Sequence, residues 1–174
     1  MKYAFFILIG IIAIISIVVV PRIRKDINKK LSFENTYAIQ NVASETVIRA
    51  FNAGTKNENK IIGYSHKNWE CVTWEMIDLG ENTFLLKNLF TEKTFQPKST
   101  PKSGVGLWQQ SMGGTTLQHW EFLKQADETY KIRLKNTDLF ITISSNEIDA
   151  PLILMPNDNS DKQNWKLIRQ TPWI

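Results

Sequence analysis

The sequence contains few of the residues that most often carry catalysis. Among its 174 residues are one cysteine, Cys71, and two histidines, His66 and His119. One cysteine makes no internal disulfide, and two histidines in distant segments lack the spacing of a metal site. No glycine-rich phosphate loop is present, and the carboxylates stand singly in turn-like segments. We therefore expect no catalytic activity, cofactor or metal, and we expect Cys71 to be a small buried residue.

The chain has no net positive charge outside its N-terminal 30 residues. The formal net charge is +4, yet residues 1–30 contain six basic groups and one acidic group. The rest of the chain has 15 basic and 16 acidic groups, a net charge of −1. A protein that follows nucleic-acid phosphates is expected to present a basic face. The balance therefore argues against nucleic acid as a partner.

The chain has one long hydrophobic run, at residues 3–20. These 18 residues carry no charge, and as a helix they would span about 27 Å, close to the roughly 30 Å of a bilayer core. Pro21 ends the run, and no Ala-x-Ala cleavage pattern precedes it. We predict that residues 1–21 form a transmembrane anchor (or an uncleaved signal) that enters the lipid bilayer through residues 3–20, and that residues 22–35 form a basic juxtamembrane linker. The protein would then be a single-pass membrane protein.

Two indications conflict on which side of the membrane the rest of the chain lies. Five basic residues follow the apolar run and only Lys2 precedes it, which favours a cytoplasmic position. Those basic residues also suit contact with anionic lipid headgroups. A sugar-binding domain, considered below, is expected outside the cytoplasm, so both sides remain open.

Beyond the linker, three tryptophans recur at nearly equal intervals. Trp74, Trp120 and Trp165 are 46 and 45 residues apart, and each precedes a charged residue and two apolar ones. Gln118 and Gln163 stand two places before the second and third of these tryptophans. A fixed period of this length indicates one structural unit used three times.

Each repeat has the pattern of four short strands. An aromatic residue opens it, at Tyr37, Phe84 and Tyr130. Short runs rich in β-branched and aromatic residues follow, bounded by Gly, Pro, Asn, Asp and Ser. No apolar stripe at helical spacing occurs between Leu31 and Trp173. The sequence therefore predicts an all-β domain of about twelve strands.

The aromatic start, the apolar third run and the closing Gln-x-Trp resemble the repeat of ricin-type β-trefoil lectins. The resemblance implies a six-stranded barrel capped by three hairpins, with pseudo-threefold symmetry, over residues 36–174. The repeats would cover about 36–80, 81–126 and 127–170, and together they would share one core. The motif residues Trp74, Gln118, Trp120, Gln163 and Trp165 would be structural. Repeat one departs from the pattern, because Val72 stands where the motif glutamine is expected.

The same resemblance implies where sugars would bind. An aromatic platform is expected at the end of each third run, and the matching residues are Tyr64, Trp108 and Met155. Trp108 stands twelve residues before its motif tryptophan and the other two stand ten, so we expect a two-residue insertion in repeat two. Sugar stacking on an exposed ring with nearby polar groups is the recognition mode implied.

The polar partners of that sugar site depart from the family pattern. The family has an aspartate that accepts hydrogen bonds from the sugar, and the matching residues here are Arg49, Pro97 and Thr142. It also has an asparagine before the motif tryptophan, and the matching residues here are Cys71, Leu117 and Lys162. Other polar residues stand near the two aromatic platforms and are candidate ligand-binding residues. The candidates are Trp108 with Gln109, Gln110 and His119, and Tyr64 with His66 and Arg49.

Two functions follow from these features. The first is a membrane-tethered, lectin-like carbohydrate-binding module without catalytic activity, whose partner is a glycan or polysaccharide. The second is a protein-interaction β-trefoil whose sugar sites have degenerated and whose partner is another protein.

Overall fold

The structure is a computed structural model that describes residues 33–173. The chain divides into two units, Met1–Glu34 and Asn35–Ile174, and the fold described here is that of the second. The predicted anchor and most of the predicted linker lie outside the described residues. Within residues 33–173, no helix has the length and apolar character needed to cross a membrane.

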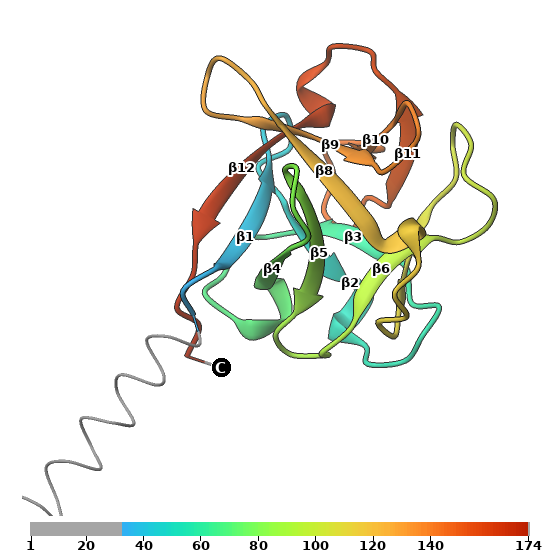
Figure 1. The fold of residues 1–174 in the computed structure, drawn as a ribbon. Coiled ribbons are helices and arrows are strands. Elements are labelled where there is room, and N and C mark those ends of the chain that lie inside the picture. The colour runs from blue at the N-terminus through green and yellow to red at the C-terminus, as the bar shows by residue number, and fades with distance from the viewer. Residues whose placement is uncertain (1–32, 174) are drawn as a thin grey trace, which may run out of the picture. The chain divides into compact units, whose positions relative to one another are not determined.

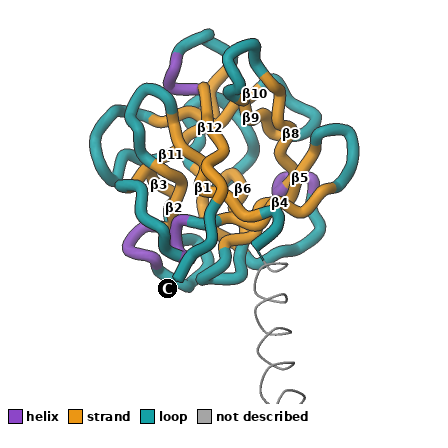
Figure 2. The backbone as a smooth tube through the Cα atoms, turned by 90° about the vertical axis from the view of Figure 1, so that its left-hand side faces the viewer, coloured by secondary structure: helices purple, strands orange, loops and turns teal. Residues whose placement is uncertain are grey.

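The described residues form twelve strands, four in each repeat. Figure 2 shows helix in this part of the chain only as short turns. The strands of repeat one are β1 (Thr36–Asn41), β2 (Val47–Ala50), β3 (Ile61–Tyr64) and β4 (Trp74–Asp78); those of repeat two are β5 (Thr83–Asn88), β6 (Thr94–Pro97), β7 (Leu107–Gln110) and β8 (His119–Lys124); those of repeat three are β9 (Tyr130–Leu134), β10 (Leu139–Ile143), β11 (Leu152–Pro156) and β12 (Asn164–Arg169). The predicted all-β class is confirmed.

The first and last strands of each repeat close into a barrel. Antiparallel pairing runs from β1 to β4, β5, β8, β9 and β12, and β12 returns to β1, so all six strands have two neighbours (Figure 1). The second and third strands form the hairpins β2–β3, β6–β7 and β10–β11. Single bridges join these hairpins to one another, among them Lys60 to Trp108 and Gly106 to Ile153. The arrangement is the trefoil that the repeat predicts.

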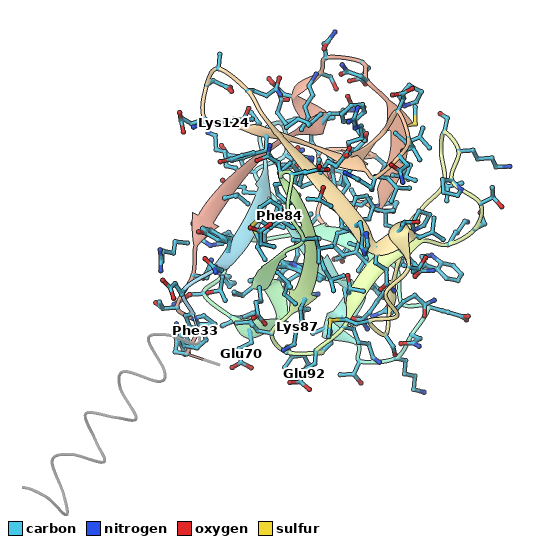
Figure 3. The ribbon with its side chains drawn as sticks, in the orientation of Figure 1. Phe33, Glu70, Phe84, Lys87, Glu92 and Lys124 are labelled. Carbon is cyan, nitrogen blue, oxygen red and sulfur yellow. The ribbon has the colours of Figure 1, made fainter. Side chains whose placement is uncertain are left out.

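The three motif tryptophans lie in the shared core, and each is at most 1% exposed. The indole N–H of Trp74 donates to the Ile48 carbonyl at 2.9 Å, and that of Trp165 donates to the Ile141 carbonyl at 3.1 Å. Trp120 instead packs its ring 5.1 Å from the ring of Phe95. The aromatic starters pack against this core from the barrel; Phe84 is labelled on β5 in Figure 3. Burial of such large rings provides much of the driving force for folding.

The two motif glutamines bond the hairpins of repeats two and three to the loops that follow them. Gln163 is fully buried and donates to the Thr142 hydroxyl at 3.1 Å and the Pro156 carbonyl at 2.8 Å. Its side-chain oxygen accepts from the Asp158 amide. Gln118 makes the matching set in repeat two, so these side chains satisfy polar groups that the fold has removed from water.

Two asparagines that the sequence analysis passed over hold neighbouring repeats together. The Asn88 amide donates to the carbonyls of Cys71 and Thr73, and its oxygen accepts from the amides of Phe90 and Thr91. Asn41 makes the equivalent contacts between repeats one and three. In repeat three the corresponding position holds Leu134, which is buried.

Candidate functional site

The hairpin registers define which residues correspond between repeats. Arg49 faces Ile62, Gln96 faces Trp108, and Thr142 faces Ile153. The motif glutamines bond to Gln96 and Thr142 in the same way, which supports this correspondence. It follows that Gln96, not Pro97, takes the position expected for an acceptor aspartate.

The same registers move the aromatic platform of repeat two. Val47 faces Tyr64, Thr94 faces Gln110, and Phe140 faces Met155, so Gln110 is the counterpart of Tyr64 and Met155. All three stand ten residues before a motif tryptophan. The expected two-residue insertion is therefore wrong. Trp108 instead occupies the position of Ile62 and Ile153, where the other repeats have an aliphatic side chain.

Alternation along β7 separates its two glutamines. Successive side chains of a strand point to opposite faces. Gln109 lies on the core face and is 0% exposed; its amide donates to the carbonyls of Gly54 and Lys56, and its oxygen accepts from the Thr91 hydroxyl. Its polar groups are therefore used inside the protein. Trp108 and Gln110 lie on the opposite face and are partly exposed.

Trp108 belongs to a row of side chains that crosses two repeats. The register places Gln96 directly opposite it on one side, and an isolated bridge places Lys60 opposite it on the other. Lys60 is in turn hydrogen-bonded to Phe51, because the Phe51 main-chain amide donates to the Lys60 carbonyl at 2.9 Å. The Lys60 ammonium lies 4.1 Å from the Phe51 ring centroid. The main chain of Lys60 is thus paired with that of Trp108, while its ammonium contacts the ring of Phe51.

A second cation and a second amide complete this surface. The Lys98 ammonium lies 5.8 Å from the Trp108 ring centroid, within the range of a cation–π contact. Gln110 follows Trp108 by two residues and so shares its face. We call this surface the Trp108 face, and it consists of Phe51, Lys60, Gln96, Lys98, Trp108 and Gln110.

Gln96 is oriented by a neighbour. The Gln118 amide donates to the Gln96 side-chain oxygen at 2.9 Å. This bond fixes the orientation of the Gln96 amide and leaves its N–H₂ group to donate elsewhere. The Trp108 face therefore combines a partly exposed ring with an amide donor that is held in place from behind.

His119 is the remaining sequence candidate in repeat two. It begins barrel strand β8, where it pairs with Leu85, and its carbonyl accepts from the Lys135 amide. The imidazole is partly buried and forms no hydrogen bond within the described residues. His119 thus lies on the barrel and not on the β6–β7 hairpin.

Of the repeat-one candidates, Arg49 and Tyr64 contact each other, and His66 contacts Gln170. The Arg49 guanidinium lies 3.4 Å from the Tyr64 ring centroid, and Arg49 is only 6% exposed. One face of the tyrosine ring is therefore covered. The His66 ring is hydrogen-bonded to the Gln170 amide. Burial raises the pKa of the Cys71 thiol, and nearby Arg49 only partly offsets this, so the thiol is held in its neutral form.

Repeat three offers no ring at its outer surface. Met155 occupies the platform position, and its sulfur accepts a hydrogen bond from the Ser103 hydroxyl at 3.4 Å. Lys131 is nearly buried and donates to the side chains of Asn157 and Asn159, which fixes the loop after β11. Of the three related positions, repeat two therefore has the most open site.

Three hollows in the described residues lie away from the Trp108 face, among them one beside Glu121 and one beside Cys71. One, of about 260 Å³, is polar and is lined by Glu121, Arg133, Asn136, Thr137 and Asp138. Burial would raise the pKa of the Glu121 carboxyl, but hydrogen bonds and charges from Arg133 and Lys135 outweigh it and lower that pKa. The other, of about 300 Å³, is lined by Ala53, Trp69, Cys71 and Phe90. Within residues 33–173, no three His, Cys, Asp or Glu side chains are placed to hold a metal ion.

The sequence matches no protein-family model and no curated protein, but solved structures resemble its fold. The designed three-fold symmetric protein ThreeFoil superposes with a TM-score of 0.75 at 22% identity, over 78% of this chain and 99% of that one. A ricin B-like lectin from Macrolepiota procera, solved in complex with lactose, has a TM-score of 0.68 at 21% identity, over 77% and 94%.

An exo-β-1,3-galactanase from Clostridium thermocellum also contains a similar fold. It superposes with a TM-score of 0.74 at 22% identity, over 78% of this chain and 30% of the galactanase. This chain therefore resembles one part of that enzyme. At these identities the likenesses establish the fold, and the fold is that of the β-trefoil proteins.

Proposed function

We propose that this protein is a lectin-like carbohydrate-binding module without catalytic activity. The observation that carries the proposal is Trp108, a partly exposed ring flanked by the amides of Gln96 and Gln110. A sugar presents an apolar C–H face that stacks on such a ring, while its hydroxyls need fixed donors and acceptors. The likeness to a lectin solved with lactose supports the same reading.

The site is shallow, so its affinity for a single sugar is expected to be modest. Only one of the three repeats exposes a ring with free polar partners, and multivalent presentation would then raise the apparent affinity. Residues 3–20 supply a means of such presentation, because an apolar run of 18 residues suits a membrane anchor. We therefore propose that the module is tethered to a membrane and displays the Trp108 face to glycans.

Binding to glycans tests this proposal directly. The full chain in a non-ionic detergent is applied to an array of oligosaccharides and polysaccharides, together with Trp108→Ala and the control Trp173→Ala. Trp173 is 67% exposed and lies outside the Trp108 face. We expect binding that falls at least about tenfold in Trp108→Ala, or ~1.4 kcal/mol, and is unchanged in the control. Absence of binding to every glycan class would remove the proposal.

The protein-interaction reading rests on a different surface. The hollow between Trp69 and Phe90 is lined by apolar side chains, and Phe90 is 49% exposed. An exposed aromatic beside an apolar hollow is typical of a contact for another protein. If this is the functional surface, cross-linking in cells would capture a protein partner that Phe90→Asp loses and Trp108→Ala retains. Capture of glycans alone would count against it.

A further inference from the structure

The charges around Trp108 point to a more specific ligand, and this inference rests on the proposed function. We infer that the Trp108 face binds a glycan unit that carries a negatively charged group, such as a carboxylate, sulfate or phosphate ester. The inference comes from the two lysines of the face and from the way Gln96 is held.

Lys60 is placed so that its ammonium group serves the same ligand as the Trp108 ring. Its main chain is paired with that of Trp108, so the two side chains leave the same face of neighbouring strands. The ammonium lies 4.1 Å from the Phe51 ring centroid, and Lys60 is exposed, so its charge stands at the surface. A sugar stacked on Trp108 would therefore have this positive charge along one edge.

Lys98 supplies a second positive charge near the same ring. It comes from the chain directly after β6, and its ammonium lies 5.8 Å from the Trp108 centroid. Lys98 is exposed, so it remains hydrated and free to turn toward a ligand. Two lysines from two different repeats thus neighbour Trp108: Lys98 through its ammonium group and Lys60 through main-chain pairing.

Neither lysine is neutralised by the protein. Within the described residues, the ion pairs involve Lys87, Lys124, Arg133 and Lys135, and none involves Lys60 or Lys98. The acidic residues of the adjacent turns are Glu58 and Glu92, and both are exposed. Figure 3 shows Glu92 at the lower edge of the domain, pointing outward. The local charge is therefore positive on a domain whose overall charge is close to neutral.

The hydrogen-bonding groups of the face favour a ligand rich in acceptors. Gln118 donates to the side-chain oxygen of Gln96, which orients that amide and leaves its N–H₂ group to donate. Both ammonium groups are donors only, and the Trp108 face contains no carboxylate. A neutral sugar hydroxyl both donates and accepts, whereas a carboxylate, sulfate or phosphate ester only accepts. The two ammonium groups and the Gln96 N–H₂ are donors, and Gln110 both donates and accepts, so donors outnumber acceptors on this face and favour an acidic sugar over a neutral one.

Matched polysaccharide pairs test the inference. The full chain in non-ionic detergent is titrated with a polyuronate and its carboxyl-reduced form, and with a sulfated polysaccharide and its desulfated form. Anionic lipid vesicles without sugar form a third arm. The variants are Lys60→Gln, Lys98→Gln, their combination and Trp108→Ala, with Lys166→Gln as a control because Lys166 is exposed on β12.

We expect at least one acidic polymer to bind about tenfold or more tightly than its neutral form. The combined lysine variant should lose that preference while retaining weak binding, Trp108→Ala should lose both, and Lys166→Gln should change neither. Raising the salt concentration should reduce the preference, because exposed charges are screened.

Three results would overturn the inference. Equal binding of acidic and neutral forms, with loss only in Trp108→Ala, would leave the carbohydrate-binding proposal standing and remove the charge requirement. Equal binding of sugar-free anionic vesicles, unaffected by Trp108→Ala, would show simple electrostatic adsorption. Failure to bind any polysaccharide would remove the proposed function and this inference together.

Discussion

The guanidinium of Arg49 rests on the ring of Tyr64, with the guanidinium carbon 3.4 Å from the ring centroid. This contact occupies the outer position of repeat one, where a sugar would otherwise stack. Arg49 is almost fully buried, and its Nε has no hydrogen-bond partner within the described residues. The platform ring of repeat one is therefore covered by an internal contact, whereas repeat two has Gln110 at that position and a partly exposed ring at Trp108.

The first prediction uses the single cysteine as a reporter of this contact. Arg49 lowers the pKa of the Cys71 thiol against the larger, opposite effect of burial. Arg49→Met should therefore raise the thiol pKa further. Alkylation requires the thiolate, so the midpoint of iodoacetamide reaction against pH should move to higher pH. An unchanged or lower midpoint would show that Arg49 does not act on Cys71.

The second prediction distinguishes the roles of the two motif glutamines, Gln118 and Gln163. Gln118 and Gln163 are both buried, and each bonds three groups. Replacing either by Ala leaves buried polar groups unpaired, which should lower the free energy of unfolding by about 1–3 kcal/mol in urea titrations. Only Gln118→Ala also releases Gln96.

Glycan affinity should therefore fall in Gln118→Ala and remain within about twofold of the parent in Gln163→Ala. The glycan affinity of both variants is measured without urea, at a temperature at which each variant is folded. Equal loss of affinity in the two variants would mean that Gln118 acts on stability alone.

The third prediction concerns acid stability. Glu121 is bonded by Arg133 at 2.7 Å and Lys135 at 3.1 Å, and its pKa is held below the ordinary 4.5. A carboxyl with a lowered folded-state pKa stabilises the protein above its unfolded-state pKa, and that stabilisation is lost as the pH falls through the folded-state value.

Glu121→Gln should therefore be less stable than the parent at pH 7, and the difference should shrink as the pH falls below about 4.5. Thermal unfolding across pH 3–7 measures this difference. Glu128→Gln is a suitable control because Glu128 is an exposed partner in a surface pair with Lys124. A difference that grows toward low pH would contradict the assignment.

The fourth prediction concerns residues 3–20. If they anchor the chain, the full protein should sediment with membranes and resist carbonate extraction, and removal of residues 2–21 should release it. Protease added to intact cells then reports the side of the membrane. Digestion of the trefoil from outside would support a glycan-binding role at the surface. Release of the full chain by carbonate would contradict the anchor.

Much of the fold follows from the sequence, because the 46-residue period repeats both the buried tryptophan and the strand pattern. The candidate site could be predicted less completely from the sequence. Counting ten residues back from Trp120 gives Gln110, but the aromatic character of Trp108 favoured an insertion instead. Counting back to the second strand pairs Pro97 with Thr142, because the segments between that strand and the tryptophan differ in length. Counting twelve residues forward from the aromatic starters leads instead to Arg49, Gln96 and Thr142, which agrees with the hairpin registers.

Other parts of the site have no local signal. Lys60 neighbours Trp108 only because hairpins of two repeats meet at a bridge, a contact between positions 48 residues apart. Gln109 was taken as a surface amide, yet the register directs it to the core, where carbonyls of the β2–β3 loop hold it. Both results depend on how the hairpins pack, which sequence spacing does not specify.

The most direct measurement of the central claim is equilibrium glycan binding of Trp108→Ala beside Trp173→Ala, with unfolding free energies measured in parallel. Trp108 is partly exposed on the hairpin, so its loss should reduce affinity at least about tenfold while both variants keep the stability of the parent to within about 1 kcal/mol. Undiminished binding by Trp108→Ala would contradict the account.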